Sequence, residues 1–358
     1  MKKILLILTL VLVLLYTAGC ELLSEKAGGD LKDVELAAAL SLDKNESGKI
    51  EAGVQLLHRD KALEQQYAES YYSLAADGAS PAEAVAELYD QGARQLNFSH
   101  AALLVLGEEA AGLDNWLDYA VRSPQLRPTL YPVICRGSAA DLLDAGEETM
   151  SPVYLLENAL EPHGSGYPGA SAVTLQDFLE TLYDDGIAPV LPLAEKTADG
   201  IKLAGMAIYD GVEWQFLPES DAAFCWRLLQ RPQHLAGEVL TLQEDFSLNI
   251  IAAKVFYRLN RAEPPAQPTL QVELTLKAEV VHNPAGLSQM EIERQARERL
   301  QYIFAESLDE SRRLQLDFLG IGREIKRKLP ELWADWQHTD YLNEIAAALN
   351  VDMTIEMN

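Results

Sequence analysis

The residue with the most distinctive chemistry is Cys20, because its thiol stands where a lipid can be attached. Two lysines open the chain, an almost unbroken apolar run covers 4–16, and small residues lead up to Cys20. This order is typical of a secretory signal, and the run is shorter than the roughly 20 apolar residues that span a membrane. We therefore predict a lipoprotein signal peptide at 1–19, with Cys20 acylated as the new N-terminus.

One position departs from this pattern. Lipoprotein signals usually carry Leu three positions before the cysteine, whereas this chain has Thr17. An ordinary cleaved signal followed by an incidental cysteine, or an uncleaved anchor, is therefore the alternative.

The stretch 43–54 imitates a calcium-binding loop but does not complete it. Oxygen-bearing side chains alternate from Asp43 onward and Gly48 stands at the sixth position. Val54 occupies the twelfth position, where a bidentate carboxylate should close the loop. We predict a tight hairpin turn here and no metal site.

The segment 164–169 matches a dinucleotide-binding fingerprint by letter only. Such a fingerprint binds pyrophosphate when it joins a strand to the start of a helix. Pro162 and Pro168 interrupt both sides of this segment. It is therefore interpreted as a flexible interdomain loop, and no cofactor is expected.

The histidines and the remaining cysteines form no recognisable zinc-binding or catalytic set. None of the six histidines is paired at one helical turn, and no cysteine pair stands near them. Cys225 and His234 are the most plausible nucleophile and base, but an isolated pair of this kind is usually coincidence. Cys135 and Cys225 have apolar neighbours, which predicts two buried free thiols and leaves one disulfide between them open.

Chain length limits the number of domains, and net charge limits the classes of partner. Removing 19 of 358 residues leaves 339, enough for two or three domains. The chain has 29 Lys and Arg against 55 Asp and Glu, a formal charge of −26, which argues against a nucleic-acid partner. The same charge repels anionic lipid, so contact with the membrane should depend on the lipid at Cys20 or on a partner protein.

A polar tether is expected at 20–32, followed by the first domain at 33–155. In this domain, hydrophobic periodicity and capping residues predict strands that alternate with helices. Ser80-Pro81-Ala82-Glu83 has a cap residue, a proline at the first helical position and an acid at the third. The predicted strands are 34–42, 53–57, 101–107 and 129–135, and the predicted helices are 80–96, 113–123 and a short one after Ser138.

Prolines and glycines between 146 and 171 mark the best boundary, after which we predict a second, smaller domain at 156–235. A helix is expected at 174–183. Pro189 and Pro192 favour an edge strand or extended loop at 187–193. Asp210-Gly211 predicts a hairpin between 201–209 and 212–217.

The third domain, 236–358, has the clearest patterns. Apolar residues alternate through the strand 271–280 and again through a final strand at 351–357. Ser288 and Glu291 form a capping box before an amphipathic helix, and further helices are expected around 307–329 and 339–349. The whole chain is thus predicted to be α/β (α+β type) and multi-domain, with mixed sheets each covered by helices.

Two features of the last domain have two interpretations each. Trp333 and Trp336 are expected in the core, with an exposed docking surface as the alternative. A basic cluster suits the solvated end of a helix, or else faces anionic lipid or an acidic partner loop. The cluster consists of Arg323, Lys326, Arg327 and Lys328.

Several of these segments together resemble the Ger(x)C lipoproteins, the C subunits of spore germinant receptors. The segments similar to family motifs are 35–44 with its Asp-Lys turn, Asn97-Phe98-Ser99-His100, Gly107-Glu108-Glu109, Arg136-Gly137-Ser138-Ala139, and Asp317-Phe318-Leu319-Gly320-Ile321-Gly322 with Pro330, Trp333 and Trp336. Glu21-Leu22 stands where the family often has Trp-Asp, and Ser41-Leu42 replaces a commoner Gly-Ile. The resemblance therefore indicates a divergent member.

The resemblance implies a three-domain, non-catalytic protein held by lipid at Cys20 on the extracytoplasmic face of the inner spore membrane. Its partners would be membrane-embedded A and B type receptor subunits, and its task would be receptor assembly or signalling during spore germination. Two other classes stay open: a solute-binding lipoprotein of a transporter, which needs a large cleft between similar lobes, and an extracytoplasmic hydrolase, which needs a nucleophile within reach of a base.

Overall fold

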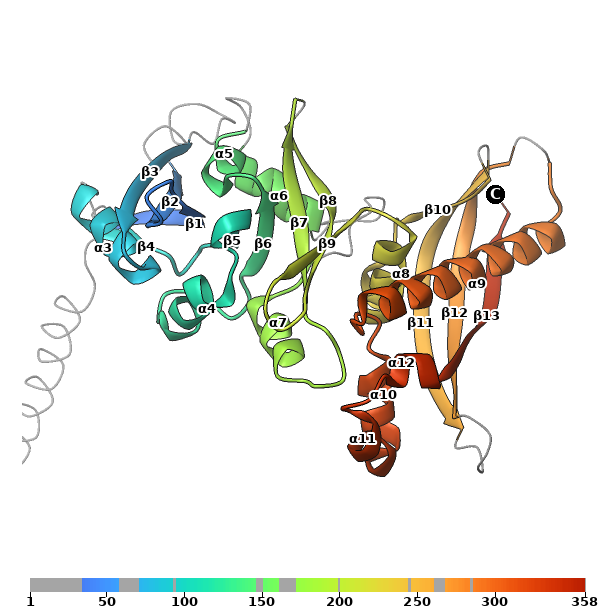
Figure 1. Ribbon diagram of the computed structural model, residues 1–358. Coiled ribbons are helices and arrows are strands. Elements are labelled where there is room, and N and C mark those ends of the chain that lie inside the picture. Colours follow the sequence, from blue (N-terminus) through green and yellow to red (C-terminus); the bar gives the residue numbers. More distant parts are fainter. Residues whose placement is uncertain are drawn as a thin grey trace, which may run out of the picture.

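The computed structural model describes residues 34–57, 71–92, 95–145, 151–160, 172–198, 200–243, 246–260, 268–283 and 286–357. Two sheets stand side by side, one of nine strands within 34–218 and one of four strands within 239–356 (Figure 1). Cys20, the predicted signal peptide and tether, and the glycine-rich segment 164–169 lie outside the described residues.

The first sheet has a parallel centre with an antiparallel hairpin on each side. Its order is β3-β2-β1-β5-β6-β7-β8-β9, with β4 beside β1. The contacts β1–β5, β5–β6 and β6–β7 are parallel, and the outer contacts are antiparallel. The strands are β1 (Val34–Lys44), β2 (Ile50–Leu57), β3 (Tyr71–Gly78), β4 (Gln95–Asn97), β5 (Leu103–Gly107), β6 (Tyr131–Arg136), β7 (Val190–Thr197), β8 (Gly200–Tyr209) and β9 (Trp214–Pro218).

Helices cover both faces of this sheet, because successive side chains of a strand point to opposite faces. On β5, Leu104 and Leu106 pack in the large core, whereas Leu103 and Val105 pack in a second, smaller core. The helices on the first face are α3 (Pro81–Gln91), α4 (Leu113–Arg122) and α7 (Leu175–Leu182), and those on the second are α5 (Ala139–Leu143) and α6 (Pro152–Leu160). Because helices cover both faces of the sheet, the central strands are buried on both sides, and their sequences are continuous apolar runs.

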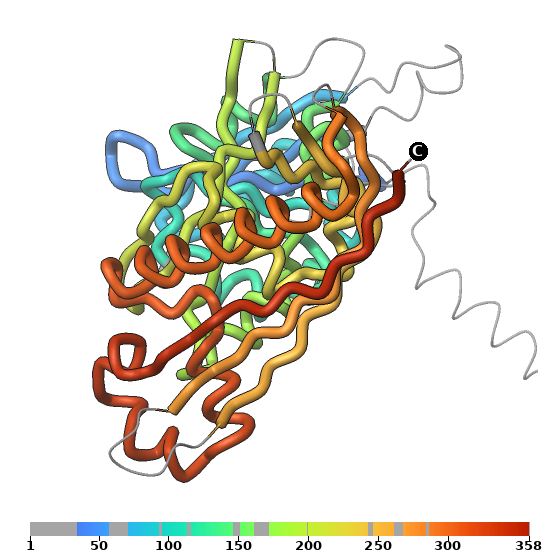
Figure 2. Tube along the Cα trace, turned by 90° about the vertical axis from the view of Figure 1, so that its right-hand side faces the viewer, coloured from blue at the N-terminus to red at the C-terminus, as the bar shows by residue number. Residues whose placement is uncertain are grey.

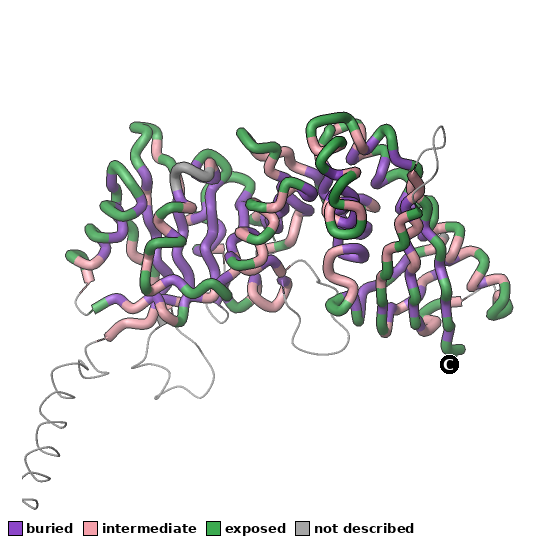
Figure 3. The backbone as a smooth tube through the Cα atoms, turned by 90° about the horizontal axis from the view of Figure 1, so that it is seen from below, coloured by how far each residue is buried: buried purple, intermediate pink, exposed green. Residues whose placement is uncertain are grey.

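The second sheet has the order β10-β11-β12-β13, and α9 (Gln289–Leu314) runs across one of its faces (Figure 2). Its strands alternate between buried and exposed residues, whereas the central strands of the first sheet are mostly buried (Figure 3). The strands are β10 (Val239–Gln243), β11 (Phe246–Asn260), β12 (Thr269–His282) and β13 (Ala346–Glu356).

Short helices complete the chain. The bridge between the sheets is α8 (Asp221–Gln230) followed by the 3-10 turn η3 (Pro232–His234), and a second such turn, η2 (Glu108–Ala110), follows β5. After α9 come α10 (Ile321–Lys328), α11 (Pro330–Trp336) and α12 (Tyr341–Glu344).

Most of the predicted elements are confirmed within one to four residues, including the hairpin on Asp210-Gly211 and the capping of α9 by Ser288. The turn at 45–49 is also the predicted tight hairpin. The Asn45 side chain accepts hydrogen bonds from the amides of Ser47 and Lys49, and Gly48 adopts a φ of 77°. That side chain is therefore used to hold the turn.

Four predicted elements are wrong in extent or type. The helical region expected around 307–329 is interrupted, because α9 ends at Leu314 and α10 begins at Ile321. The helix at 80–96 ends at Gln91, and β4 begins at Gln95. The helix expected at 339–349 is present only as α12, at 341–344, because β13 begins at Ala346 and pairs with β12. The segment 187–193 leads into an interior strand and not an edge strand. Its pairing with β6 begins only at Leu193, so Pro192 lies where β7 has a single partner and the missing N–H is tolerated.

The first sheet continues across the boundary expected at 155/156, because β6 pairs directly with β7. The helix α6 also occupies part of the segment that contained the boundary. The division of the chain into domains at 33–155, 156–235 and 236–358 stays a prediction.

Three of the motif segments meet at the carboxyl ends of β1, β5 and β6. The Asp43 carboxylate accepts hydrogen bonds from the amides of Ala139 and Ala140, both at 2.8 Å, at the N-terminus of α5. A Cβ on Gly107 would lie 2.0 Å from Asp43 Oδ1. Position 107 therefore has to be glycine for the carboxylate to reach the helix.

This contact predicts a non-additive pair of substitutions. Gly107→Ala should lower the free energy of unfolding by about 1–3 kcal/mol, because the new methyl group displaces the Asp43 carboxylate. In an Asp43→Ala background the same substitution should cost clearly less, because the obstructing oxygen is gone. Urea unfolding of the four proteins measures both effects, and equal costs in the two backgrounds would refute the contact.

Candidate functional site at the junction of the two sheets

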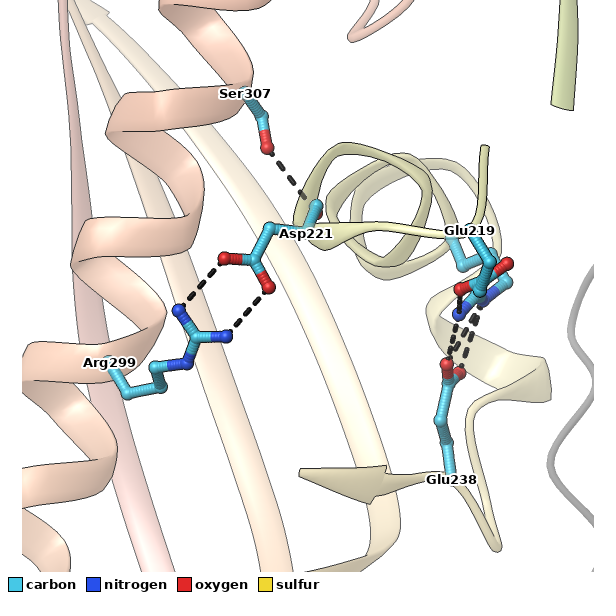
Figure 4. Close-up of polar contacts among 6 residues, drawn as sticks. Glu219, Asp221, Glu238, Arg299 and Ser307 are labelled. Carbon is cyan, nitrogen blue, oxygen red and sulfur yellow. Dashed lines mark hydrogen bonds and ion pairs between the residues drawn. The ribbon is translucent and has the colours of Figure 1, made fainter. Parts of the chain in front are cut away.

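The candidate site is the cleft where the two sheets meet. It has a volume of about 570 Å³ and lies between α8, α9 and β10. Figure 4 shows the charged side chains that converge here from these elements and from the turn before α8. The lining residues are Leu203, Glu219, Ser220, Asp221, Phe224, Arg227, Glu238, Val239, Leu240, Thr241, Arg299 and Ile303.

Arg227 on α8 is the central cation of the cleft. Its Nε donates to Glu238 Oε1 at 3.0 Å, and its Nη2 donates to Glu219 Oε1 at 2.8 Å. The side chains of Arg227 and Glu238 are only 10% and 8% exposed, so water has little access to the bond between them. Burial alone would lower the pKa of Arg227, but the two carboxylates outweigh it and raise that pKa above its ordinary value. The guanidinium is therefore permanently charged and fixed by both glutamates.

A second ion pair connects α8 to α9. Arg299 donates two hydrogen bonds to the Asp221 carboxylate, at 2.7 and 2.8 Å, in a bidentate arrangement. The hydroxyl of Ser307, two turns further along α9, donates to the main-chain oxygen of Asp221 at 3.4 Å. Asp221 is the first residue of α8, so these contacts position the start of the bridging helix on the second sheet (Figure 4).

The two thiols are buried and free, as predicted. Burial raises the pKa of both Cys135 and Cys225 to about 12, so both stay protonated at neutral pH. A protonated thiol is a poor nucleophile. The suggested pair of Cys225 and His234 therefore lacks the thiolate that such chemistry needs.

The helix α10 contacts the loop that precedes β7. Lys326 Nζ lies 3.0 Å from Asp184 Oδ1, and the Arg323 amide donates to the Gly186 oxygen at 2.6 Å. A Cβ on Gly186 would lie 2.5 Å from the Arg323 nitrogen, so the two backbones are in direct contact. For the basic cluster, the predicted solvated helix end describes Arg327 and Lys328, which are exposed, but the pairing of Lys326 with a loop of the same chain was not predicted.

Asp317 holds the turn that presents this cluster. Its carboxylate accepts hydrogen bonds from the Ile321 amide at 3.0 Å, the Gly322 amide at 2.6 Å and the Tyr341 hydroxyl at 2.8 Å. Burial raises its pKa, and these hydrogen bonds oppose that shift. Its main-chain oxygen accepts from the Ala188 amide across the junction at 2.8 Å. The Asp-x-x-Gly-x-Gly motif is thus a structural turn at the contact between the sheets.

The tryptophans follow the expected core interpretation. Trp333 is 4% exposed and its ring contacts Tyr341 edge-on, with ring centroids 5.2 Å apart. A Cβ on Gly322 would lie 2.9 Å from the Trp333 ring, which explains the last glycine of the motif. Trp336 is half-buried against the same core.

Sequence reasoning missed Glu219, Arg227 and Glu238. Glu219 lies 8 residues before Arg227, and Glu238 lies 11 residues after it. The three residues belong to no motif, so only the fold brings them together. A weak signal was present, because Arg227 interrupts the apolar run 222–229, where an unpaired buried charge would be costly.

The described ranges contain neither a metal-binding cluster nor a membrane-spanning helix. No three His, Cys, Asp or Glu side chains there are grouped as a metal ion would require. Likewise, no helix in those ranges has both the length and the apolar character needed to cross a membrane.

Comparison with known proteins gives consistent relatives. Residues 29–196 match the family described as spore germination protein N-terminal domain, and residues 239–358 match spore germination B3/GerAC like, C-terminal. Spore germination protein KC of Bacillus subtilis (strain 168) is 24% identical over 314 residues, which cover 77% of this chain and 75% of that protein. The crystal structure of the GerBC protein matches with a TM-score of 0.56 at 15% identity, covering 88% of this chain and 96% of that one.

These matches confirm the mixed α/β fold class. They also leave 197–238 outside both family models, and this segment contains α8 with Arg227. The cleft is thus built where the two matched regions are joined.

The buried pairing predicts that Arg227 matters far more than an exposed arginine. Arg227→Met should lower the free energy of unfolding by about 3–5 kcal/mol, because Glu238 is left charged and buried without a partner. The matched control is Arg122→Met, which breaks an ion pair of 2.6 Å whose side chains are 77% and 72% exposed, and which should change stability little. Urea unfolding followed by circular dichroism compares the two variants, and equal losses of stability would contradict the buried pairing of Arg227 with Glu238.

Proposed function

The chain belongs to the Ger(x)C family of spore germination proteins, and on that basis we propose that it is the lipid-anchored C subunit of a nutrient germinant receptor. It serves receptor assembly or signalling through protein contacts, without catalysis. The observation that carries the proposal is that models of both the N-terminal and the C-terminal domain match in order, over 29–196 and 239–358.

The junction supports a role by contact. The charged groups of the cleft are bonded to one another, so their main effect is to hold the two sheets together. A transporter's solute-binding protein would need two similar lobes, whereas these sheets have nine and four strands. A hydrolase that used either cysteine would need a thiolate, and both thiols have a pKa near 12.

We further propose that Cys20 carries the lipid and that the chain lies on the extracytoplasmic face of the inner spore membrane. A single acyl chain gives only marginal membrane binding, so a second chain or a partner must add to it. Membrane-embedded A and B type subunits would do so, because two linked weak attachments bind far more tightly than either alone. The formal charge of −26 keeps the body itself away from anionic lipid.

Deletion of the gene and substitution of the anchor test the proposal. Spores that lack the chain should lose their germination response to at least one nutrient, and Cys20→Ala spores should respond about tenfold more slowly or worse, because membrane attachment is weakened. The loss of optical density after nutrient addition gives the rate, and fractionation of spores gives the membrane-bound share of the protein.

Cys135→Ala is the matched control, because it removes a buried thiol that is not part of the signal sequence and should leave the rate near that of wild type. A deletion strain that responds normally to every nutrient would overturn the receptor role. Normal membrane fractionation of Cys20→Ala would overturn only the lipid anchor.

A further inference from the structure

One edge of the second sheet is left open at the cleft. β10 pairs with β11 on one side, and among the described residues no other strand pairs with its second side. Four consecutive positions, 238–241, line the cleft. Successive side chains of a strand point to opposite faces of the sheet. The cleft contacts all four positions, so it extends along the edge of the strand and not along one of its faces.

The hydrogen-bond pattern shows which main-chain groups face this edge. The Ile250 amide donates to the Glu238 oxygen at 2.8 Å, and Leu240 stands opposite Leu248 in the same ladder. Antiparallel strands exchange these bonds at every second residue. Val239 and Thr241 therefore direct their N–H and C=O groups into the cleft.

The surface beside this edge combines apolar side chains with a net negative charge. Val239 is 48% exposed, and Leu203 of the first sheet lines the cleft with it. The lining has three carboxylates and two guanidinium groups, which leaves one negative charge. The side chains of Glu219 and Asp221 are 49% and 37% exposed, whereas those of Arg227 and Arg299 are 10% and 31% exposed, so the accessible charge is acidic on balance.

We propose that the free edge of β10 is a docking site for an extended, basic segment of a partner protein, which adds a strand to the second sheet. Main-chain bonds to Val239 and Thr241 would supply affinity in this mode, and the side chains would supply selectivity. An apolar residue of the segment suits Val239, and a Lys or Arg suits Glu219. The inference deepens the proposed function, on which it rests for the existence of a partner.

A designed peptide tests the site without knowledge of the partner. The probe is a fluorescein-labelled Val-Lys-Val-Lys-Val-Lys peptide, titrated with the full mature chain and followed by fluorescence anisotropy. A peptide of equal charge, N-methylated at alternate amides, cannot complete a ladder and should bind about tenfold more weakly. Hydrogen exchange at the Val239 and Thr241 amides should slow when the unmodified peptide binds.

Two substitutions separate the site from the general acidity of the chain. Glu219→Gln should weaken binding about fivefold or more, because it removes the accessible carboxylate while Glu238 still holds Arg227. Glu87→Gln removes the same charge from the exposed side of α3 and should leave binding unchanged.

Three outcomes would overturn the proposal. They are equal binding of the N-methylated peptide, equal weakening by Glu87→Gln and Glu219→Gln, or self-association of the chain that slows exchange at the Val239 and Thr241 amides without any peptide. None of them depends on the germination assay. Failure of this site and failure of the receptor role can therefore be told apart.

Discussion

Burial of one guanidinium group is the constraint on which the arrangement of the two sheets depends. Arg227 cannot be solvated where it lies, so Glu219 at the end of the first sheet and Glu238 at the start of the second must both be brought to it. The bonds formed this way fix α8, and Asp221 with Arg299 then fixes α8 on α9. The contact of α10 with the 184–188 loop closes the same junction from another side.

What the sequence revealed depended on whether the relevant pattern was local. β12 and α9 were found because periodicity and a capping Ser288 are written in neighbouring residues. β7 was misjudged, because Pro192 excludes an interior strand only where two partners need its N–H, and the register decides that. β3 and β11 were not predicted, and the paired charges around Arg227 lie too far apart along the chain to be recognised.

The motif residues acquire physical roles in this fold, and those roles are structural. Asp43 binds the start of α5 at a point where only Gly107 leaves it room, and Asp317 binds the turn before α10 beside Gly322. In both places a carboxylate accepts amide hydrogen bonds next to a glycine that a methyl group would crowd. Both motifs therefore act on the arrangement of the backbone.

The distance between the two sheets in solution tests this account most directly. Spin labels can be placed at two exposed positions, Glu87 on α3 of the first sheet and Thr275 on β12 of the second. Double electron–electron resonance on the full mature chain should then give one narrow distance distribution, because paired charges fix the sheets relative to each other. A broad or two-peaked distribution would show that the sheets move independently and would contradict the account.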